Sequence, residues 1–423
     1  MLRTANLFIL ILAFLLISCN AEEAPAEKTV APVAVSAANP KDVQPAILNF
    51  LQAAGSYFKK HQFDSGRFEY LLNTSDKLSG KDIYNVVRHA GVVYALALYA
   101  QHTGDNQFSE VLQKASQYLW DVNIKAVDNT GHLAVWSVPG ENFYVDSFGK
   151  AKLGSTGLAL AGMIVKERIG GEALPLDKLQ KLGEFLLYMQ LEDGGFYASY
   201  HEKAGRVEPK KYQYYPGEAA LGLCALYERD PQTKWLEGAI KAVNLPANNL
   251  EEMEKKAIDH WDLIAIAKIF DLLKAEGKDL SSYNHLMVYS RRLVERLLAE
   301  WDSSTVKGSF MSDYGTTPTA TRIEGLTAIA PYLKVDGTLL EPTLTVIREA
   351  CHFLINSQLK EGPYQGGIPM AVKKKEYENS KESRFAIDTY NKHAAEIRID
   401  YVQHAMCALL GYDRLLQLGM YGE

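Results

Sequence analysis

Six stretches of the chain share one pattern, in which a polar or charged residue opens a run of apolar residues. Behind that residue each run is rich in Ala, Gly and Leu and has few charges, at residues 88–96, 154–160, 216–223, 260–266, 322–329 and 398–406. A helix that is apolar on nearly all sides must be buried on every side. Amphipathic helices alternate with these runs, with apolar residues at spacings of three and four, as in residues 47–58, 179–189 and 286–298. The pattern predicts six inner and six outer helices in a closed double ring.

A second repeated element, a glycine followed by an aromatic or aliphatic residue, comes after most of the outer helices. It occurs at residues 64–70, 131–136, 193–197, 308–314 and 366–369, and only the fourth unit lacks it. The glycine allows a turn that a β-carbon would hinder, and the apolar residue lets the chain re-enter the core. Because this loop lies between an outer and an inner helix, we expect the loops and the inner helix N-termini to share one rim. That rim would hold the functional site.

This organisation resembles the (α/α)6 toroid of the six-hairpin glycosidase superfamily over roughly residues 45–420. The loop element is also similar to the Gln-Trp repeat of terpenoid cyclases and related toroids. Residues 185–190, which end in Gln190, lead into residues 193–196, and residues 353–358 precede Gly366 in a looser copy. The Asp-x-Asp-Asp motif of the cyclases is absent, so their activity is not implied. The resemblance implies an all-α fold with one central cavity.

The N-terminus predicts export and a lipid anchor. Arg3 precedes an apolar stretch over residues 7–17 that is too short to cross a membrane. Residues 16–19 end in Cys19 and resemble the lipobox of bacterial lipoproteins, which implies a signal peptide over residues 1–18 and a diacylated Cys19. An ordinary secretory signal is the alternative. Asn20 favours the outer membrane within the bacterial cell envelope.

The segment that follows is expected to be a tether, so the organisation is residues 19–42 as lipidated cysteine and disordered linker, and residues 43–423 as the toroid domain. The linker is rich in Ala, Glu, Pro and Val and has almost no aromatic residues, so it cannot bury enough surface to fold.

Composition and missing motifs exclude several classes of function. The formal net charge of −6 argues against a general nucleic-acid binder. No paired Cys-x-x-Cys, His-Glu-x-x-His, phosphate loop or nucleophile elbow is present. The sequence predicts neither a metal nor a cofactor. Three further cysteines lie in apolar helical contexts and are expected to be buried, namely Cys224, Cys351 and Cys407.

Four carboxylates are expected near the starts of inner helices, namely Glu218, Asp262, Glu324 and Asp400. In six-hairpin glycosidases an acid and a base project into the cavity from such positions. Glycoside hydrolysis needs two carboxyl groups, one that protonates the leaving oxygen and one that activates water or attacks carbon. The alternative is structural, because the helix dipole favours acidic residues in any first turn.

Basic and aromatic residues accompany these carboxylates. Arg88 precedes His89, Arg322 precedes Glu324, Arg398 precedes Asp400, and His404 lies one helical turn after Asp400. Arginine suits planar anions such as uronate carboxylates, although each arginine could instead tie neighbouring helices together. Part of this set resembles the pocket of N-acylglucosamine 2-epimerases: Arg88, His89, Arg322, Glu324 and His404. Tyr215 and Trp261 belong to a group of rim aromatics suited to sugar faces.

The sequence therefore predicts a carbohydrate-active lipoprotein that binds a glycan, with the membrane reached only through the lipid. The first hypothesis is a glycoside hydrolase that uses the four carboxylates. The second is a uronan lyase or sugar epimerase with His89, His404 or a tyrosine as base and arginines around a substrate carboxylate. The third is a non-catalytic glycan-binding or envelope-assembly lipoprotein.

Overall fold

The computed structural model describes residues 40–74, 84–137, 149–209, 213–335, 337–377 and 382–422. The predicted signal peptide, Cys19 and nearly all of the predicted tether lie outside these residues. The first helix begins at Pro40, just before the expected start of the domain. Within the described chain, no helix is both long and apolar enough to span a bilayer.

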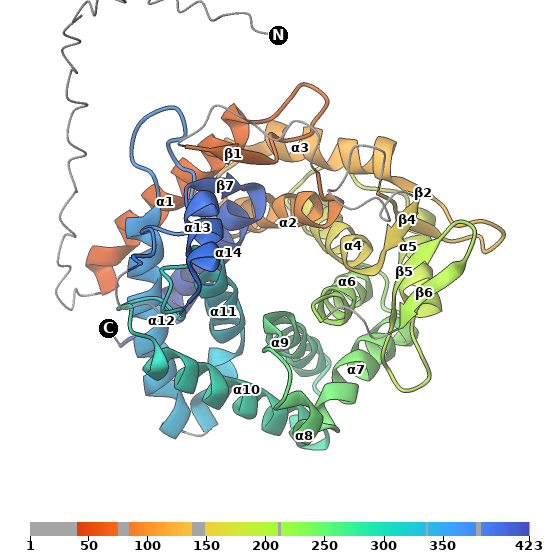
Figure 1. Cartoon of the computed structure of the whole chain (residues 1–423). Helices are drawn as coiled ribbons and strands as arrows, with labels where there is room; N and C mark the ends of the chain where they lie inside the picture. Colours follow the sequence, from red (N-terminus) through yellow and green to blue (C-terminus); the bar gives the residue numbers. More distant parts are fainter. Residues whose placement is uncertain are drawn as a thin grey trace, which may run out of the picture. The chain divides into compact units, whose positions relative to one another are not determined.

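Six buried helices form an inner ring, as predicted, and each contacts the next (Figure 1). Contacts between the first and the last of them close the ring. Their apolar character on all sides is clearest in the second, where every residue from Leu153 to Lys166 is buried. The inner helices are α2 (Val86–Thr103), α4 (Leu153–Arg168), α6 (Tyr215–Arg229), α9 (His260–Ala275), α11 (Thr316–Ile329) and α14 (Ile399–Gln417).

Six amphipathic helices surround this ring, and each packs against an inner helix with its apolar face. They are α1 (Pro40–Lys60), α3 (Ser109–Tyr118), α5 (Leu176–Tyr188), α7 (Thr233–Ala247), α10 (Asn284–Ser303) and α12 (Gly337–Ser357). Two short helices lie between ring elements, α8 (Leu250–Met253) and α13 (Arg384–His393). The predicted all-α (α/α)6 architecture is confirmed.

One pair of inner helices approaches especially closely. A β-carbon on Gly157 of α4 would lie 2.3 Å from the carbonyl oxygen of Glu218 in α6. A β-carbon on Gly222 would in turn lie 2.6 Å from the carbonyl oxygen of Gly157. The small residues of the apolar runs therefore serve to bring the inner helices together.

Short antiparallel strands on the loops add detail that the helical pattern did not predict. Strands β2 (Ile124–Ala126) and β3 (Leu133–Val135) form a hairpin, and β4 (Lys150–Lys152), β5 (Tyr197–His201) and β6 (Gly205–Pro209) form a three-stranded sheet. Strands β1 (Leu71–Asn73) and β7 (Glu396–Arg398) pair with Leu72 opposite Ile397. This last pair joins the first and last hairpins at the seam where the ring closes.

The glycine loops have the predicted backbone conformation and a repeated set of contacts. Gly66, Gly194 and Gly366 have positive φ, and a β-carbon on each would lie within 2.1 Å of a carbonyl oxygen of the next outer helix around the ring. A glutamine at the end of the preceding helix holds each turn. The Nε2 of Gln190 donates to the carbonyls of Gly194 and Gly238, and that of Gln358 donates to those of Gly366 and Phe50.

A third copy of this contact was not recognised in the sequence. Gln62 Nε2 donates to the carbonyl oxygens of Gly66 and of Val111 in α3. The similarity to the Gln-Trp repeat therefore has a structural basis, since each glutamine links a loop to the next outer helix. The fourth unit lacks the loop, as expected, and α8 lies in its place.

Candidate active site

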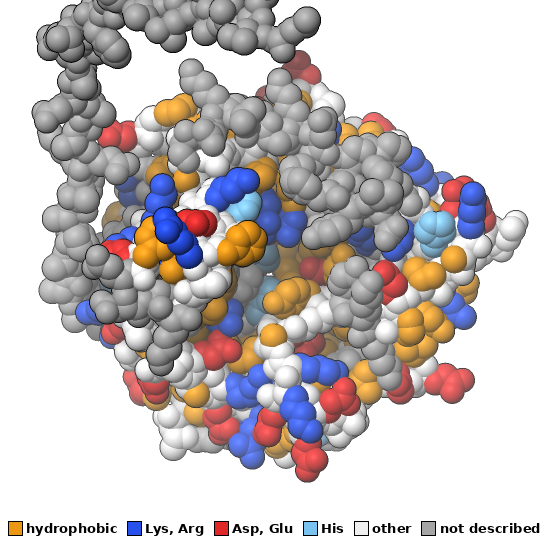
Figure 2. All heavy atoms as spheres, in the orientation of Figure 1, with side chains coloured by type: hydrophobic (Ala, Val, Ile, Leu, Met, Phe, Trp, Pro, Cys, Tyr) orange, Lys and Arg blue, Asp and Glu red, His pale blue; other side chains and the backbone are white. Residues whose placement is uncertain are grey.

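A cavity of about 580 Å³ lies at the N-terminal end of the inner ring. Figure 2 shows this face of the molecule hollowed near the centre of the ring. The cavity is lined from α2, α6, α9, α11 and α14, by Leu158 of α4, and from the loops that carry Met311 and Met370. A pocket of this size is typical of small-ligand sites. The structure thus places the starts of five inner helices and two of the loops around one cavity.

Two histidines are the central feature of this cavity. His260, the first residue of α9, and His404, in the second turn of α14, have ring centroids 5.7 Å apart at an interplanar angle of 76°. The Nε2 of His260 is buried and has no hydrogen-bond partner among the described residues. The side chain of Asp259 caps α9 by accepting from the Trp261 amide at 2.9 Å, which fixes the position of His260 at the helix start.

His404 has a buried acidic partner. Its Nδ1 donates to Oε1 of Glu324 at 2.6 Å, and the Glu324 side chain is only 3% exposed. Burial lowers the pKa of His404, but the Glu324 carboxylate outweighs this effect and the pKa is raised above its usual value. The Glu324 pKa is itself raised, because burial exceeds the effect of His404.

His260 is shifted in the opposite direction. Burial lowers its pKa well below the usual value, and the charges of His404 and Arg322 lower it further. The opposite shifts favour a neutral His260, with a buried, unpartnered nitrogen, beside a His404 that holds its proton more strongly. Such a pair can act as general base and general acid.

The other carboxylates occupy three different environments. Glu218 lines the cavity, and one of its oxygens, Oε2, is buried without a hydrogen-bond partner among the described residues. Burial raises its pKa to about 8, although Arg88 lowers it. Asp262 is directed to the outer layer instead, where it accepts a 2.6 Å hydrogen bond from the Tyr289 hydroxyl of α10. It does not line the cavity.

Asp400 lines the cavity but is fully engaged by two arginines. Arg88 Nε lies 2.9 Å from its Oδ2, and Arg398 contacts both of its oxygens at 2.6 and 2.9 Å. Burial raises the pKa of Asp400, but the two guanidinium groups hold it well below the usual range. The Tyr70 hydroxyl also contacts Arg88. Asp400 therefore stays ionised and cannot donate a proton.

The third arginine has a partner too. Arg322 Nε lies 2.6 Å from Oε2 of Glu300 in α10, and its NH1 donates to the carbonyl of Pro318. The alternative interpretation, as ties between neighbouring helices, therefore describes Arg88 and Arg322, whereas Arg398 pairs with Asp400 two residues along its own segment. The hypothesis of arginines reserved for a substrate carboxylate, as a lyase needs, loses support.

Two positions expected from the sequence differ from those in the structure. Arg322 and Glu324 do not open α11, because this helix begins at Thr316 and Glu324 lies deeper in the ring. His89 does not reach the cavity. It is fully buried between the Tyr84 hydroxyl and the carbonyl of Ala115, and burial lowers its pKa to about 4. It cannot serve as the base.

The two aromatic residues that were expected at the cavity are found there. Tyr215 and Trp261 line the cavity. The Trp261 ring centroid lies 4.9 Å from that of His260 and 6.3 Å from that of His404. Trp261 therefore supports both imidazoles from one side.

One group in the described part of the chain has the spacing for a metal ion. Ligand atoms of His260, Glu324 and His404 lie within 4.8 Å of one another. However, Glu324 and His404 are hydrogen bonded to each other, so an ion would have to replace that bond. The expectation that neither metal nor cofactor is needed stays a prediction.

His260 is the residue that the sequence did not single out. It opens the run over residues 260–266, just as Arg88 opens the first run, and this shared opening position is the signal that could have identified it. Because the sequence was searched for carboxylates, Asp262 was chosen instead. This residue lies two positions after His260 and on another side of the helix.

Comparisons with known proteins show the fold. No protein-family model and no curated protein sequence matches the chain. Among solved structures, the cellobiose 2-epimerase from Spirochaeta thermophila is similar with a TM-score of 0.62 and 14% identity, over 89% of this chain and 99% of that one. The cellobiose 2-epimerase from Bacillus thermoamylovorans gives a TM-score of 0.61 and 11% identity, over 88% and 100%.

A hydrolase has a similar structure as well. The GH76 α-mannanase from Bacteroides thetaiotaomicron gives a TM-score of 0.58 and 12% identity, over 90% of this chain and 100% of that one. These similarities show that the chain has an (α/α)6 toroid fold.

Proposed function

We propose that the protein is a sugar epimerase or isomerase that moves a proton at the carbon next to a sugar carbonyl. The observation that carries this proposal is the pair of imidazoles in one cavity, with opposite pKa shifts and one unpartnered nitrogen. The fold shared with two cellobiose 2-epimerases supports a carbohydrate substrate. The aromatic lining and the cavity volume suit a mono- or disaccharide.

In the proposed reaction, neutral His260 takes the proton from carbon 2 of an open-chain aldose, and the C–H electron pair forms an enediolate. The imidazolium of His404 then returns a proton. Delivery to the opposite face of carbon 2 gives the epimer, and delivery to carbon 1, with the proton on O2 passing to O1, gives the ketose. Arg88 and Arg322 line the same cavity, and their positive charge favours the developing enediolate.

A second candidate is a glycoside hydrolase with Glu218 as the acid. Its raised pKa of about 8 and its position in the cavity wall support a proton donor. The partner carboxylate is less well supported, because the ionised Asp400 is held in ion pairs with two arginines and Asp262 bonds Tyr289. The epimerase or isomerase proposal needs no second free carboxylate.

The proposal is tested by incubating the purified chain in D₂O with cellobiose, D-glucose and D-mannose. We expect deuterium at carbon 2 and a new epimer or ketose, both measured by NMR. New reducing ends from a glycan panel, with no deuterium at carbon 2, would establish the hydrolase instead. An unsaturated product that absorbs ultraviolet light would establish a lyase, and binding without turnover would favour the non-catalytic hypothesis.

We also propose that the domain is tethered to the bacterial envelope through Cys19, with the outer membrane favoured by Asn20. The support is the apolar stretch over residues 7–17 and the lipobox-like residues 16–19. Cys19→Ala is expected to release the protein from membranes or to block its maturation, measured by fractionation. Unchanged membrane retention would refute the anchor.

A further inference from the structure

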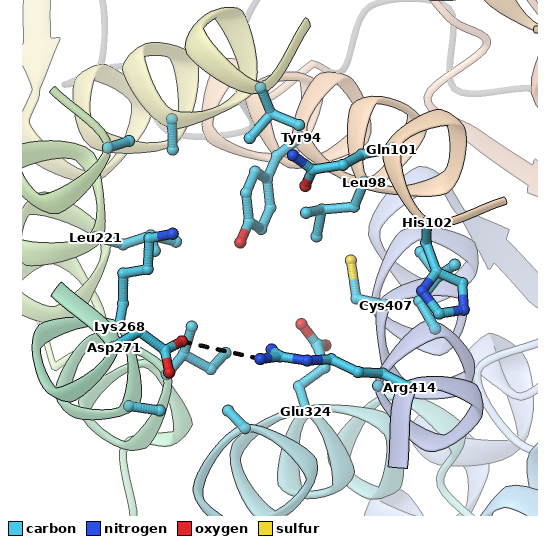
Figure 3. A pocket seen from close by; sticks show the side chains of 18 of the residues that line it. Tyr94, Leu98, Gln101, His102, Leu221, Lys268, Asp271, Glu324, Cys407 and Arg414 are labelled. Atoms are coloured by element: carbon cyan, nitrogen blue, oxygen red, sulfur yellow. Dashed lines mark ion pairs between the residues drawn. The ribbon is translucent and has the colours of Figure 1, made fainter. Parts of the chain in front are cut away.

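A second cavity, of about 510 Å³, lies at the opposite end of the inner ring. It is lined by all six inner helices, mostly by their C-terminal halves, and shares no lining residue with the first cavity. Figure 3 shows this cavity, with the side chains of Tyr94, Glu324 and Cys407 directed into it from α2, α11 and α14.

The charges around this second cavity are largely paired with one another. Glu228 lies 2.7 Å from both Arg168 and Lys268. Arg414 reaches across to Asp271 at 3.8 Å, as the dashed line in Figure 3 marks. These pairs leave little unbalanced charge for an ionic ligand. The other polar side chains of the lining, such as Glu324 and Thr327, are suited to hydrogen bonds with water.

Two side-chain pairs connect the cavities through the wall that separates them. One is aromatic: the rings of Tyr94, in the second cavity, and Trp261, in the first, have centroids 6.5 Å apart. The other is polar. Glu324 lines the second cavity, whereas its hydrogen-bond partner His404 lines the first.

We propose that Glu324 is a positioning and proton-transfer residue that connects His404 with solvent in the second cavity. This inference rests on the proposed function, in which His404 must gain and lose protons. A sugar in the first cavity would cover the face of His404 that reacts. The Nδ1 of His404 would keep its route to water through the carboxylate behind it.

The transfer involves protons only. After Nε2 of His404 has taken a proton from the sugar, the Nδ1–H bond of the imidazolium breaks, the proton passes to the Glu324 carboxylate, and a neutral imidazole protonated at Nε2 remains. The resulting carboxylic acid gives the proton to water in the second cavity and becomes a carboxylate again. In the reverse sequence Glu324, protonated from water, gives its proton to Nδ1 of an imidazole that is protonated at Nε2, and Nε2 then donates its proton to the sugar. A carboxylate with a raised pKa is suited to this exchange, because it accepts a proton more readily than an exposed one.

The other charged groups that face His404 do not offer a competing route for its proton. Glu324 approaches from α11, Asp400 from α14 itself, Arg88 from α2 and His260 from α9. Of the two carboxylates, Asp400 is held ionised by two arginines and lines the substrate cavity. Glu324 is the acid that bonds the imidazole and faces the opposite cavity.

The test uses formate as the probe in the Glu324→Ala variant of the full chain. Removal of the side chain is expected to lower the pKa of His404, measured by NMR of the imidazole. Added formate should enter through the second cavity, occupy the vacated space and restore that pKa. In the double variant with Leu98→Trp, which places a large ring in the second cavity, formate should no longer act. Val288→Trp, on the exposed face of α10, is the matched control.

The NMR measurement needs no turnover, so it decides the route even if no sugar is converted. Restoration by formate despite Leu98→Trp, or no restoration at all, would overturn the proposal. With a sugar that is turned over, Glu324→Ala should lose about 10²-fold in kcat and recover with formate. Glu324→Gln keeps the shape and leaves no room for formate, so it should stay slow. Full activity of Glu324→Gln would overturn the relay while leaving the proposed function intact.

Discussion

His260→Gln is expected to lower kcat for deuterium exchange at carbon 2 by about 10²–10⁴-fold, the usual contribution of a positioned general base. Glutamine has a similar length but no nitrogen that can accept a proton at neutral pH. Because Nε2 of His260 has no hydrogen-bond partner among the described residues, the substitution removes no hydrogen bond made by this nitrogen. KM should change little, since the residue acts on the reacting proton.

The dependence on pH distinguishes this role from a structural one. The pKa of His260 is lowered below its ordinary value of 6.5, so kcat/KM should rise with pH at the acid side as this base becomes neutral. The pKa of His404 is raised, so kcat/KM should fall at the alkaline side as this acid loses its proton. Glu324→Gln removes the carboxylate that raises the pKa of His404, and the alkaline limb should move to lower pH.

His285→Gln is the control, because this histidine bonds Asn244 on the outer ring, away from the cavity. It should leave both rate and pH profile unchanged. If His260→Gln turns over at the wild-type rate, the two-histidine mechanism is wrong. Glu218 would then be the first group to examine, as the acid of the hydrolase alternative.

The architecture could be predicted because it depends on coarse physical features. A helix such as α4, which is buried on all sides, differs in composition from an amphipathic one, and six alternations fix the double ring. The glycine loops were evident for the same reason, since their turns require positive φ. The short strands were not predicted, because three-residue pairings have too little sequence pattern to identify them.

The site was predicted less well because a helix turns about 100° per residue. His89 follows Arg88, yet Arg88 lines the cavity and His89 is buried towards α3. The start of α11 was misplaced for another reason. Residues 316–321 are rich in threonine and contain Pro318, which suggests a loop, but a proline is tolerated in the first turn of a helix. Such rotations and offsets depend on packing that a single sequence does not reveal.

Asp400→Asn is expected to lower the free energy of unfolding at neutral pH by about 3–5 kcal/mol, as when one partner of a buried ion pair is removed. Asp400 connects Arg88 of α2 with Arg398 beside α14 at the seam of the ring. Next to it, β1 pairs with β7, and the Ile399 amide donates to the carbonyl of Tyr70. Asparagine fits the space but leaves two guanidinium groups without their anion.

The loss should depend on pH in a defined direction. The folded-state pKa of Asp400 lies well below its ordinary value of 3.8, so its stabilisation is fully present above that value. This stabilisation disappears only as the pH falls through the lower, folded-state pKa. The difference in the free energy of unfolding between wild type and variant, measured by denaturant unfolding, should therefore be constant near neutrality and shrink below about pH 4. Glu300→Gln, which removes a more exposed partner of Arg322, should cost no more than about 1 kcal/mol. An Asp400→Asn loss equally small would mean that the strands and the helix packing close the ring without this ion pair.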